Sequence, residues 1–255
     1  MKVELLTHTE NPDKLIAAAA KLCYAKSDIG SLMDNLTEEK IDSFLNTLSG
    51  LGHESPIEHA SFTFGIEGVS RALLAQITRH RIASFSVQSQ RYVRKSNFEY
   101  ITPPAIAANE EAMKVYLEAM QKDAEVYDKL CQILTETEKK RLIESGVDEK
   151  TAQKTAEKIA NEDARFVLPN SCDTRIIMTM NVRSLYNFFN LRCCNRAQWE
   201  IKELAWQMLK LCREVSPLLF AKAGPSCVKG ACREGKMSCG KMTEIRERSA
   251  TLNAK

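Results

Sequence analysis

The sequence lacks several features that define large classes of protein. No apolar run approaches the length that crosses a bilayer, and no Gly-rich phosphate loop of the type found in nucleotide kinases occurs. Residues 1–6 carry a glutamate within a short apolar run, without the long hydrophobic segment of a secretory signal. We therefore expect a cytoplasmic protein that does not enter a membrane and does not transfer phosphate through a P-loop.

A strong excess of one charge sign is also missing. The 36 basic and 33 acidic residues give a formal net charge of +3, which is too even for a general nucleic-acid binder. Any anion must then be recognised by local clusters of charge. The 255 residues fit one large domain with a small appendage. We expect a domain over 1–223 and a Cys- and Gly-rich tail over 224–255.

Hydrophobic periodicity predicts many helices and few strands. The alternation of Phe62, Phe64 and Ile66 indicates a strand over 61–67, and shorter strands are expected at 1–6 and 175–180. Helices are expected over 12–23, 37–49, 69–81 and 105–146. A further helix is expected to run from there to about 163, followed by helices over 182–192 and 197–221. The predicted fold class is α/β in the α+β sense, with a small mixed or antiparallel sheet and long peripheral helices.

The densest chemistry lies between Arg79 and Tyr92. Four cationic or potentially cationic residues and three serines fall within these fourteen positions. Arginine presents a planar fork of donors that matches phosphate oxygens in pairs, and serine hydroxyls add further donors. A nucleotide phosphate or a dinucleotide diphosphate is the natural ligand. The structural alternative is that basic residues at the end of a helix stabilise its dipole.

The same cluster carries a family resemblance. Arg-His-Arg at 79–81, followed after seven residues by Ser89 and one residue later by Arg91, resembles the diagnostic motif of the flavin-dependent thymidylate synthases. Blocks similar to the family's flanking sequences follow in the family's order at 52–59, 165–169, 181–185, 187–192 and 197–201. The resemblance covers roughly residues 1–220.

The resemblance implies an activity and its cofactors. The reaction would be the reductive methylation of dUMP to dTMP, with methylenetetrahydrofolate as carbon donor, FAD as cofactor and NADPH as reductant. No serine or cysteine needs to attack the pyrimidine, because the flavin carries the reaction and the protein supplies binding and electrostatics. The resemblance also implies a homotetramer with active sites between subunits.

The resemblance further implies roles for individual residues. FAD would be bound by Ser55, Arg79, His80, Arg81, Asn181, Arg183 and Asn187. The nucleotide dUMP would be bound by Gln76, Arg79, Val87, Gln88, Ser89, Gln90, Arg91, Arg165 and Arg192. The catalytic residues would be Arg192 and His53. Since an arginine keeps its proton, Arg192 would act electrostatically on the uracil ring, whereas His53 would approach the flavin and folate.

Two positions depart from the family's pattern. Val87 stands where many members have Glu or Gln, so a contact with dUMP there is limited to backbone or apolar atoms. Arg196 stands where many members have His, and its guanidinium could pair with a phosphate or a ribose edge. Ordinary structural roles also remain open: Arg183 and Asn187, four residues apart, suit a solvated helix face.

Nine cysteines are present, an odd number in a chain without an export signal, which favours free thiols over a disulfide framework. We expect no metal, with a zinc site built from four thiolates as the alternative. Its ligands would be Cys194, Cys227, Cys232 and Cys239. The tail spacings of four and six residues are wider than the usual two to four. Small core residues are expected at Cys23, Cys131 and Cys212.

Two other function classes compete with the enzyme. A nucleic-acid binder that uses residues 79–94 would be colourless and salt-sensitive, but the even charge and the lack of interleaved aromatics count against it. A structural protein built around a zinc-binding tail would unfold with a chelator and would have no affinity for nucleotides.

Overall fold

The computed structural model describes residues 1–51, 54–94, 96 and 98–253. The chain divides into two compact units, called unit 1 and unit 2 below. Unit 1 comprises Met1–Ile66, Gln76–Ser86 and Ile176–Lys255. Unit 2 comprises Glu67–Ala75 and Val87–Arg175.

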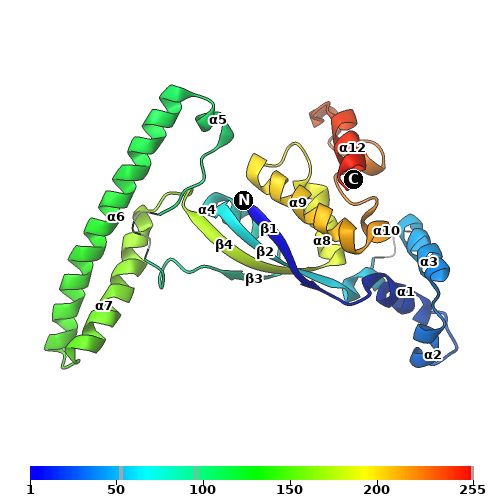
Figure 1. The fold of residues 1–255 in the computed structure, drawn as a ribbon, viewed down its shortest axis with the longest axis horizontal. Helices are drawn as coiled ribbons and strands as arrows, with labels where there is room; N and C mark the ends of the chain where they lie inside the picture. The colour runs from blue at the N-terminus through cyan, green and yellow to red at the C-terminus, as the bar shows by residue number, and fades with distance from the viewer. Residues whose placement is uncertain (52–53, 95, 97, 254–255) are drawn as a thin grey trace. The chain divides into compact units, whose positions relative to one another are not determined.

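One four-stranded sheet has the order β1-β2-β4-β3 (Figure 1). Its strands are β1 (Lys2–His8), β2 (Ser61–Ser70), β3 (Ser84–Val87) and β4 (Asp173–Asn181). Strand β4 lies between β2 and β3 although it comes late in the chain. The small sheet with long helices confirms the predicted fold class. Strand β3 was not predicted, because its four residues are too few to show a periodicity.

The sheet residues of unit 1 alternate as predicted. Phe62, Phe64 and Ile66 of β2 are buried. On the other face, the hydroxyls of Thr63 and Thr179 lie 2.9 Å apart. The alternation confirms the strand and shows that one of its faces belongs to the core.

Helices surround these strands in unit 1. The α-helices are α1 (Pro12–Leu22), α2 (Ile29–Asp34), α3 (Glu38–Leu51), α8 (Val182–Arg192), α9 (Trp199–Val215), α10 (Pro217–Phe220), α11 (Ser226–Lys229) and α12 (Met242–Thr251). Two 3₁₀ turns are η1 (Pro56–His59) and η3 (Gly235–Met237). Helix α9 packs against β1 and α8, and it buries Trp206 in the core.

Two predictions about the C-terminal part of the chain were wrong. The helix expected to run to 221 ends at Val215, because Pro217 has no N–H to donate and its ring clashes with a continuing helix. The tail from Gly224, whose Gly, Cys, Lys and Ser content predicts irregular structure, is not irregular throughout, since α12 forms there. The guanidinium of Arg213 in α9 anchors this part of the chain by donating to Ser249 of α12 and to the carbonyl oxygens of Phe220 and Ala221.

Unit 2 is dominated by a helical hairpin (Figure 1). Its helices are α4 (Arg71–Ile77, continuing into unit 1), α5 (Pro104–Ala107), α6 (Glu110–Glu144) and α7 (Glu149–Ala164), followed by the 3₁₀ turn η2 (Arg165–Val167). Helices α6 and α7 pack along each other, and Gly146 with φ +89° forms the turn between them. Buried alanines at 152, 156, 160 and 164 allow the two helices a close approach.

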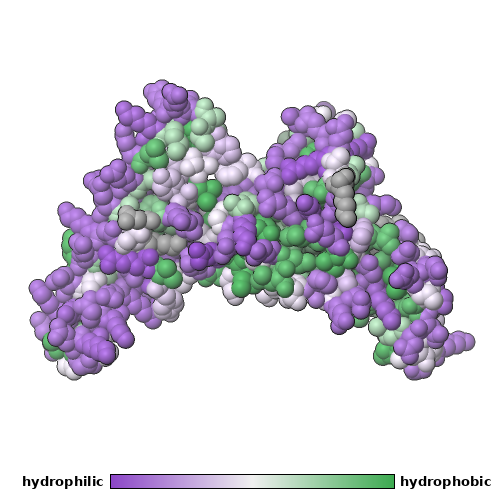
Figure 2. All heavy atoms as spheres, viewed as in Figure 1, coloured by the Kyte–Doolittle hydropathy of each residue, from purple (hydrophilic) through white to green (hydrophobic). Residues whose placement is uncertain are grey.

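The hydropathy of the visible surface differs between the helical hairpin and the strands. Hydrophilic residues cover most of α6 and α7 in Figure 2, whereas hydrophobic residues gather along the strands. Leu6 of β1 and Ile177 of β4 are both half exposed. Within the described ranges, no helix combines the length and the apolar character that a membrane span requires.

Candidate active site

A cavity of about 1040 Å³ opens in unit 1. Four parts of the chain line it: Glu54 with Glu58 of η1, the segment 79–82, helix α8 with its cap Asn181, and residues of the segment 223–233. Six cationic side chains and two acidic ones face it. These are Arg79, Arg81, Arg183, Arg192, Lys229 and Arg233, against Glu54 and Glu58. The surplus of positive charge fits an anionic ligand.

The Arg-His-Arg motif lies beyond the end of α4. The backbone N–H groups of Arg79 and His80 donate to the carbonyl oxygens of Gln76 and Ile77, three residues earlier. Such bonds tighten and end an α-helix, so the predicted helix over 69–81 ends earlier, at Ile77. The motif therefore lies in the connection between α4 and β3 and lines the cavity.

His80 is the most perturbed member of the motif. Its ring meets the edge of Phe188 at a centroid distance of 5.0 Å, and its Nε2 accepts a hydrogen bond of 3.1 Å from Nε of Arg192. Burial, assisted by the charge of Arg192, lowers the pKa of His80 to about 4. His80 is therefore neutral at pH 7 with its proton on Nδ1, and it does not contribute to the cationic cluster.

Arg192 is the last residue of α8 and is held from two sides. Besides its bond to His80, it donates from its terminal nitrogen to the carbonyl oxygen of Gln76 at 3.4 Å. Burial and the nearby Arg79 lower the pKa of Arg192, although a guanidinium still keeps its proton. The described residues offer Arg192 no carboxylate within ion-pair distance. The guanidinium of Arg192 is thus held in one orientation, and no carboxylate among the described residues neutralises its charge.

Helix α8 presents the predicted flavin residues to the cavity. Asn181 caps the helix by accepting a bond of 2.9 Å from the Ser184 N–H, and it also lines the cavity. Arg183 and Asn187, one turn apart, line the cavity as well. Hydrogen bonds and charge from Glu58, supported by Glu54, raise the pKa of Arg183. Arg183 pairs with both carboxylates, which holds η1 against the start of α8.

Unit 2 gathers part of the predicted nucleotide residues near the end of α7. Arg91 forms an ion pair of 2.7 Å with the Glu162 carboxylate, and Nε of Arg165 donates to the Glu162 carbonyl oxygen at 3.1 Å. Nε of Arg91 is buried without a hydrogen-bond partner among the described residues. The guanidiniums of Arg91 and Arg165 therefore both contact Glu162, and Nε of Arg91 has a donor that no described residue accepts.

The residues between β3 and Arg91 form a short turn in unit 2. The hydroxyl of Ser89 accepts a bond of 3.2 Å from the Arg91 N–H, and the amide of the buried Gln90 lies 3.6 Å from the Cys172 sulfur. Val87 ends β3, and the Gln88 N–H donates to the Arg175 carbonyl oxygen at 3.0 Å. The turn is therefore held by its own backbone and by β4.

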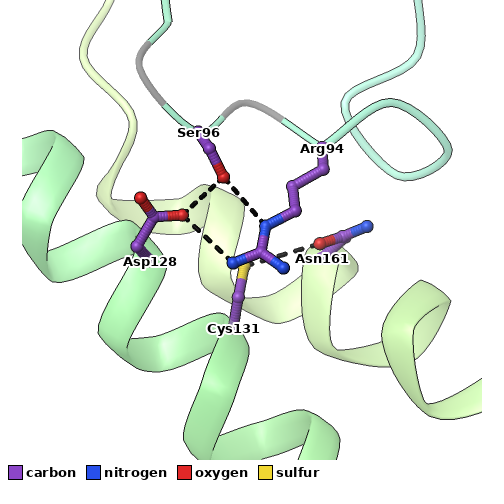
Figure 3. A network of polar contacts seen from close by, with 5 residues as sticks. All are labelled: Arg94, Ser96, Asp128, Cys131 and Asn161. Atoms are coloured by element: carbon purple, nitrogen blue, oxygen red, sulfur yellow. Dashed lines mark hydrogen bonds and ion pairs between the residues drawn. The ribbon is translucent and has the colours of Figure 1, made fainter. Parts of the chain in front are cut away.

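A polar network holds the segment that follows this turn (Figure 3). Arg94 and Ser96 both bond to the Asp128 carboxylate of α6, at 3.2 and 2.6 Å. Beneath them, the Cys131 thiol donates to the Asn161 side chain at 3.4 Å, which joins α6 to α7. The network ties the chain after Arg91 to the helical hairpin.

Some predicted site residues are not brought to the cavity. His53 lies outside the described residues. Ser55 precedes η1 without a side-chain capping bond and is absent from the described cavity wall. Gln76 contacts Arg192 through its backbone. Their assigned roles stay predictions.

Other residues join the site without having been predicted. Tyr186, Lys229 and Arg233 line the cavity in unit 1, and Glu162 pairs with Arg91 in unit 2. Tyr186 lies one turn before Asn190 on α8, so helical spacing from Arg183 and Asn187 offered a signal for the face. No spacing in the sequence connects Lys229 or Arg233 with α8.

The tail cysteines and Cys194 line a second cavity of about 440 Å³ in unit 1. Burial raises the pKa of Cys227, with smaller effects from Cys194, Cys232 and Cys239. All nine cysteines are free, and no group of three or more metal-ligating side chains is placed to hold a metal within the described ranges. Cys23 is exposed, so its prediction as a core residue was wrong, whereas Cys131 and Cys212 are buried as predicted.

Arg196, the departure from the family's His, has a structural partner. It forms an ion pair with Glu234 and donates to the Met237 carbonyl oxygen at 3.4 Å. Arg196 lines the second cavity together with Glu234. The substitution therefore links the start of α9 to the C-terminal segment.

Comparison with known proteins agrees with the motif. The family described as "Thymidylate synthase complementing protein" matches residues 4–218. The chain is 51% identical over 247 residues to the flavin-dependent thymidylate synthase of Clostridium tetani, covering 97% of this chain and 96% of that protein. It is 46% identical over 248 residues to the enzyme of that name from Geobacter sulfurreducens, with 96% and 97% covered.

A more distant relative shows the same full-length similarity. The flavin-dependent thymidylate synthase of Pyrococcus furiosus is 39% identical over 241 residues, covering 92% of this chain and 90% of that protein. Matches of this extent and identity confirm the resemblance that the Arg-His-Arg motif indicated, and the chain belongs to the flavin-dependent thymidylate synthase family.

Proposed function

We propose that the protein makes dTMP by the reductive methylation of dUMP, with FAD as cofactor, NADPH as reductant and methylenetetrahydrofolate as carbon donor. Family membership supports this reaction. The observation that carries it to a site is the cavity of unit 1, where Arg192 bonds to a neutral His80 and faces the same space as Arg79, Arg81 and Arg183.

The cavity fits a flavin dinucleotide in size and chemistry. Its volume of about 1040 Å³ is at the upper end of the range for small-molecule sites. Arg79, Arg81 and Arg183 provide donors for a diphosphate, while the amides of Asn181 and Asn187 can donate and accept. The hydride chemistry is that of the flavin when bound, and these residues bind and orient it.

Arg192 is the proposed electrostatic catalyst. Its guanidinium stabilises negative charge on the uracil ring as N3 loses its proton, which makes C5 more nucleophilic. The hydrogen bond to His80 fixes its orientation, and the absence of a carboxylate partner among the described residues leaves its charge available. A preorganised charge of this kind needs no rearrangement during the reaction.

The dUMP phosphate is the proposed ligand of Arg91 and Arg165. The buried Nε of Arg91 has no partner in the described residues, and the Ser89 hydroxyl is adjacent in the turn. Charge-assisted bonds from arginine suit a phosphate monoester. Further dUMP contacts are proposed for Gln76, Arg79, Val87, Gln88, Gln90 and Arg192. Further roles at the flavin and folate are proposed for His53 and Ser55.

Self-association as a homotetramer, with active sites between subunits, is part of the proposal. The half-exposed Leu6 and Ile177 support it, because apolar side chains on strands of the same sheet gain by burial against another copy. Cytoplasmic localisation and division into a catalytic domain over 1–223 and a tail over 224–255 belong to the same proposal.

A visible absorption spectrum of the purified protein tests the function. We expect an oxidised-flavin spectrum that bleaches with NADPH and changes when dUMP is added, followed by dTMP formation once methylenetetrahydrofolate is supplied. A colourless protein that takes up no added FAD and does not respond to dUMP would overturn the proposal and favour a nucleic-acid-binding role.

A further inference from the structure

The C-terminal segment forms one wall of the main cavity. Gly224, Ser226, Lys229, Gly230 and Arg233 are among the residues that line it, together with Ala231. The match to the family model ends at residue 218, so this wall lies outside the part of the chain that the model covers. The segment is therefore a part of the site that the family's motifs do not describe.

The wall is held in place by two arginines. Arg246 of α12 donates to the carbonyl oxygens of Cys227 and Gly230, both at 2.8 Å. Arg213 of α9 donates to the Ala223 carbonyl oxygen at 3.4 Å and to the Ser249 hydroxyl at 2.9 Å. Because α9 belongs to the core of unit 1, the Arg213 bonds fix the start of the segment and helix α12 to a rigid element, and α12 in turn holds residues 227 and 230 through Arg246.

Lys229 and Arg233 add two cations to the cavity, and they come from the C-terminal segment, far in the sequence from the Arg-His-Arg motif. Like Arg79 and Arg81, they have no carboxylate within ion-pair distance among the described residues. Together with Arg192, five cations without a carboxylate partner surround one space and repel each other, and an anion of more than one charge relieves that repulsion. Arg183 differs, since Glu54 and Glu58 already pair with it.

The surroundings of Lys229 show the same crowding of positive charge. Its Nζ lies 5.5 Å from the centroid of the Tyr186 ring, so the ammonium reaches the face of α8 that lines the cavity. Burial, followed by the charge of Lys222, lowers the pKa of Lys229, with Arg233 adding to the effect and Glu54 opposing it. An anion beside Lys229 would replace water and stabilise the charged form.

We propose that Lys229 and Arg233 bind the diphosphate of the dinucleotide that occupies this cavity, so that the segment 224–233 is part of the ligand site. The identity of the dinucleotide rests on the proposed function, and both FAD and NADPH carry a diphosphate. A monoester is a poorer fit, because a cavity of about 1040 Å³ lined by cations on two walls suits a longer ligand.

Titration of the flavin-free protein tests the inference. The double variant Lys229→Gln/Arg233→Gln should bind FAD about 10- to 100-fold more weakly, since each lost charge-assisted bond contributes on the order of 1 kcal/mol or more. Riboflavin, which has the ring but no phosphate, should bind the variant and the wild type equally. The matched control is Lys236→Gln/Lys241→Gln, which removes the same charge from the same part of the chain but neither from the cavity wall nor from the charges that act on Lys229.

Measuring the KM for NADPH in the same double variant identifies which dinucleotide carries the diphosphate that the segment binds. If the FAD dissociation constant rises while the KM for NADPH is unchanged, the segment binds the flavin diphosphate. If only the KM for NADPH rises, the segment binds the nicotinamide dinucleotide. Unchanged FAD affinity and unchanged KM in a variant that melts like the wild type would refute the inference, as would an equal loss of riboflavin binding.

Failure of the proposed function has a different signature. A wild-type protein that binds neither FAD nor riboflavin and forms no dTMP would remove the basis for both ideas. A wild-type protein that binds FAD and forms dTMP, together with a double variant indistinguishable from it, would remove the role of the segment alone.

Discussion

Arginine serves both units, but in opposite electrostatic settings. In unit 1, Arg192 is oriented by the neutral His80 and by a backbone carbonyl, and no carboxylate compensates its charge among the described residues. In unit 2, Arg91 is already paired with Glu162 at 2.7 Å. A neutral partner leaves the full charge to act on a ligand, whereas a carboxylate partner must be exchanged for the ligand's anion.

We expect the greatest loss of activity when the uncompensated charge of Arg192 is removed. We expect Arg192→Ala to lower dTMP formation by about 10²- to 10³-fold, because a preorganised charge at a reacting centre is worth that much. The flavin spectrum should be retained, since the other cavity arginines remain. Arg141→Ala, which removes an arginine paired with Glu138 on α6, is the control. Substantial turnover by Arg192→Ala would disprove its role.

A second, smaller effect should appear in unit 2. We expect Arg165→Ala to raise the KM for dUMP by about 10- to 100-fold, because a charged hydrogen bond to phosphate contributes about 1.5–3 kcal/mol. FAD affinity should not change, because the residues proposed to bind FAD lie in unit 1. Steady-state kinetics and flavin titration on the same preparation measure both quantities. Loss of FAD binding with an unchanged KM for dUMP would reverse the assignment of the two units.

The neutrality of His80 can be measured through stability. Its pKa of about 4 in the folded state lies below the usual value of 6.5, so between these values the unfolded state binds a proton that the folded state does not. The free energy of unfolding should fall as the pH drops from 6.5 to 4, by about 2 kcal/mol after allowing for partial exposure of the ring.

Urea unfolding of the flavin-free protein at several pH values checks this. His80→Asn should show a weaker dependence in that window than the wild type. Equal slopes in the wild type and His80→Asn would mean that the ring titrates normally and that Arg192 has a cationic neighbour.

A still smaller effect is expected when Arg91 loses its carboxylate partner and so becomes uncompensated, as Arg192 is. Glu162→Gln removes the carboxylate that pairs with Arg91 and leaves its backbone carbonyl to hold Arg165. We expect dUMP to bind about two- to fivefold more tightly, because a partly exposed ion pair is worth about 0.5–1 kcal/mol. Equilibrium binding of dUMP measures this, and weaker binding would show that Glu162 positions Arg91 for the phosphate.

Local pattern was sufficient for much of the fold. The alternation of Phe62, Phe64 and Ile66 identified β2, and the periodicity from Val182 to Arg192 identified α8 with both of its ends. Each of these signals is complete within one element, because side-chain direction repeats every two residues in a strand and about every 3.6 in a helix. Strand β3 and helix α12 carried no such signal and were missed.

The candidate site divides along the same line. The spacing of Arg79, Arg81, Ser89 and Arg91 was sufficient to indicate anion binding and, through its resemblance, the family. The spacing could not reveal that His80 is neutral, because that depends on Phe188 and Arg192. It could not place Lys229 on the same cavity either, because the contact with Tyr186 joins separate elements.

The periodic elements, the near-balanced charge and the family motif can be read from the order of the amino acids alone. Which charges are compensated and which side chains share a cavity depends on how the chain folds. The reason is that compensation acts over a few ångströms in space, and the bond between His80 and Arg192 joins residues 112 positions apart in the chain.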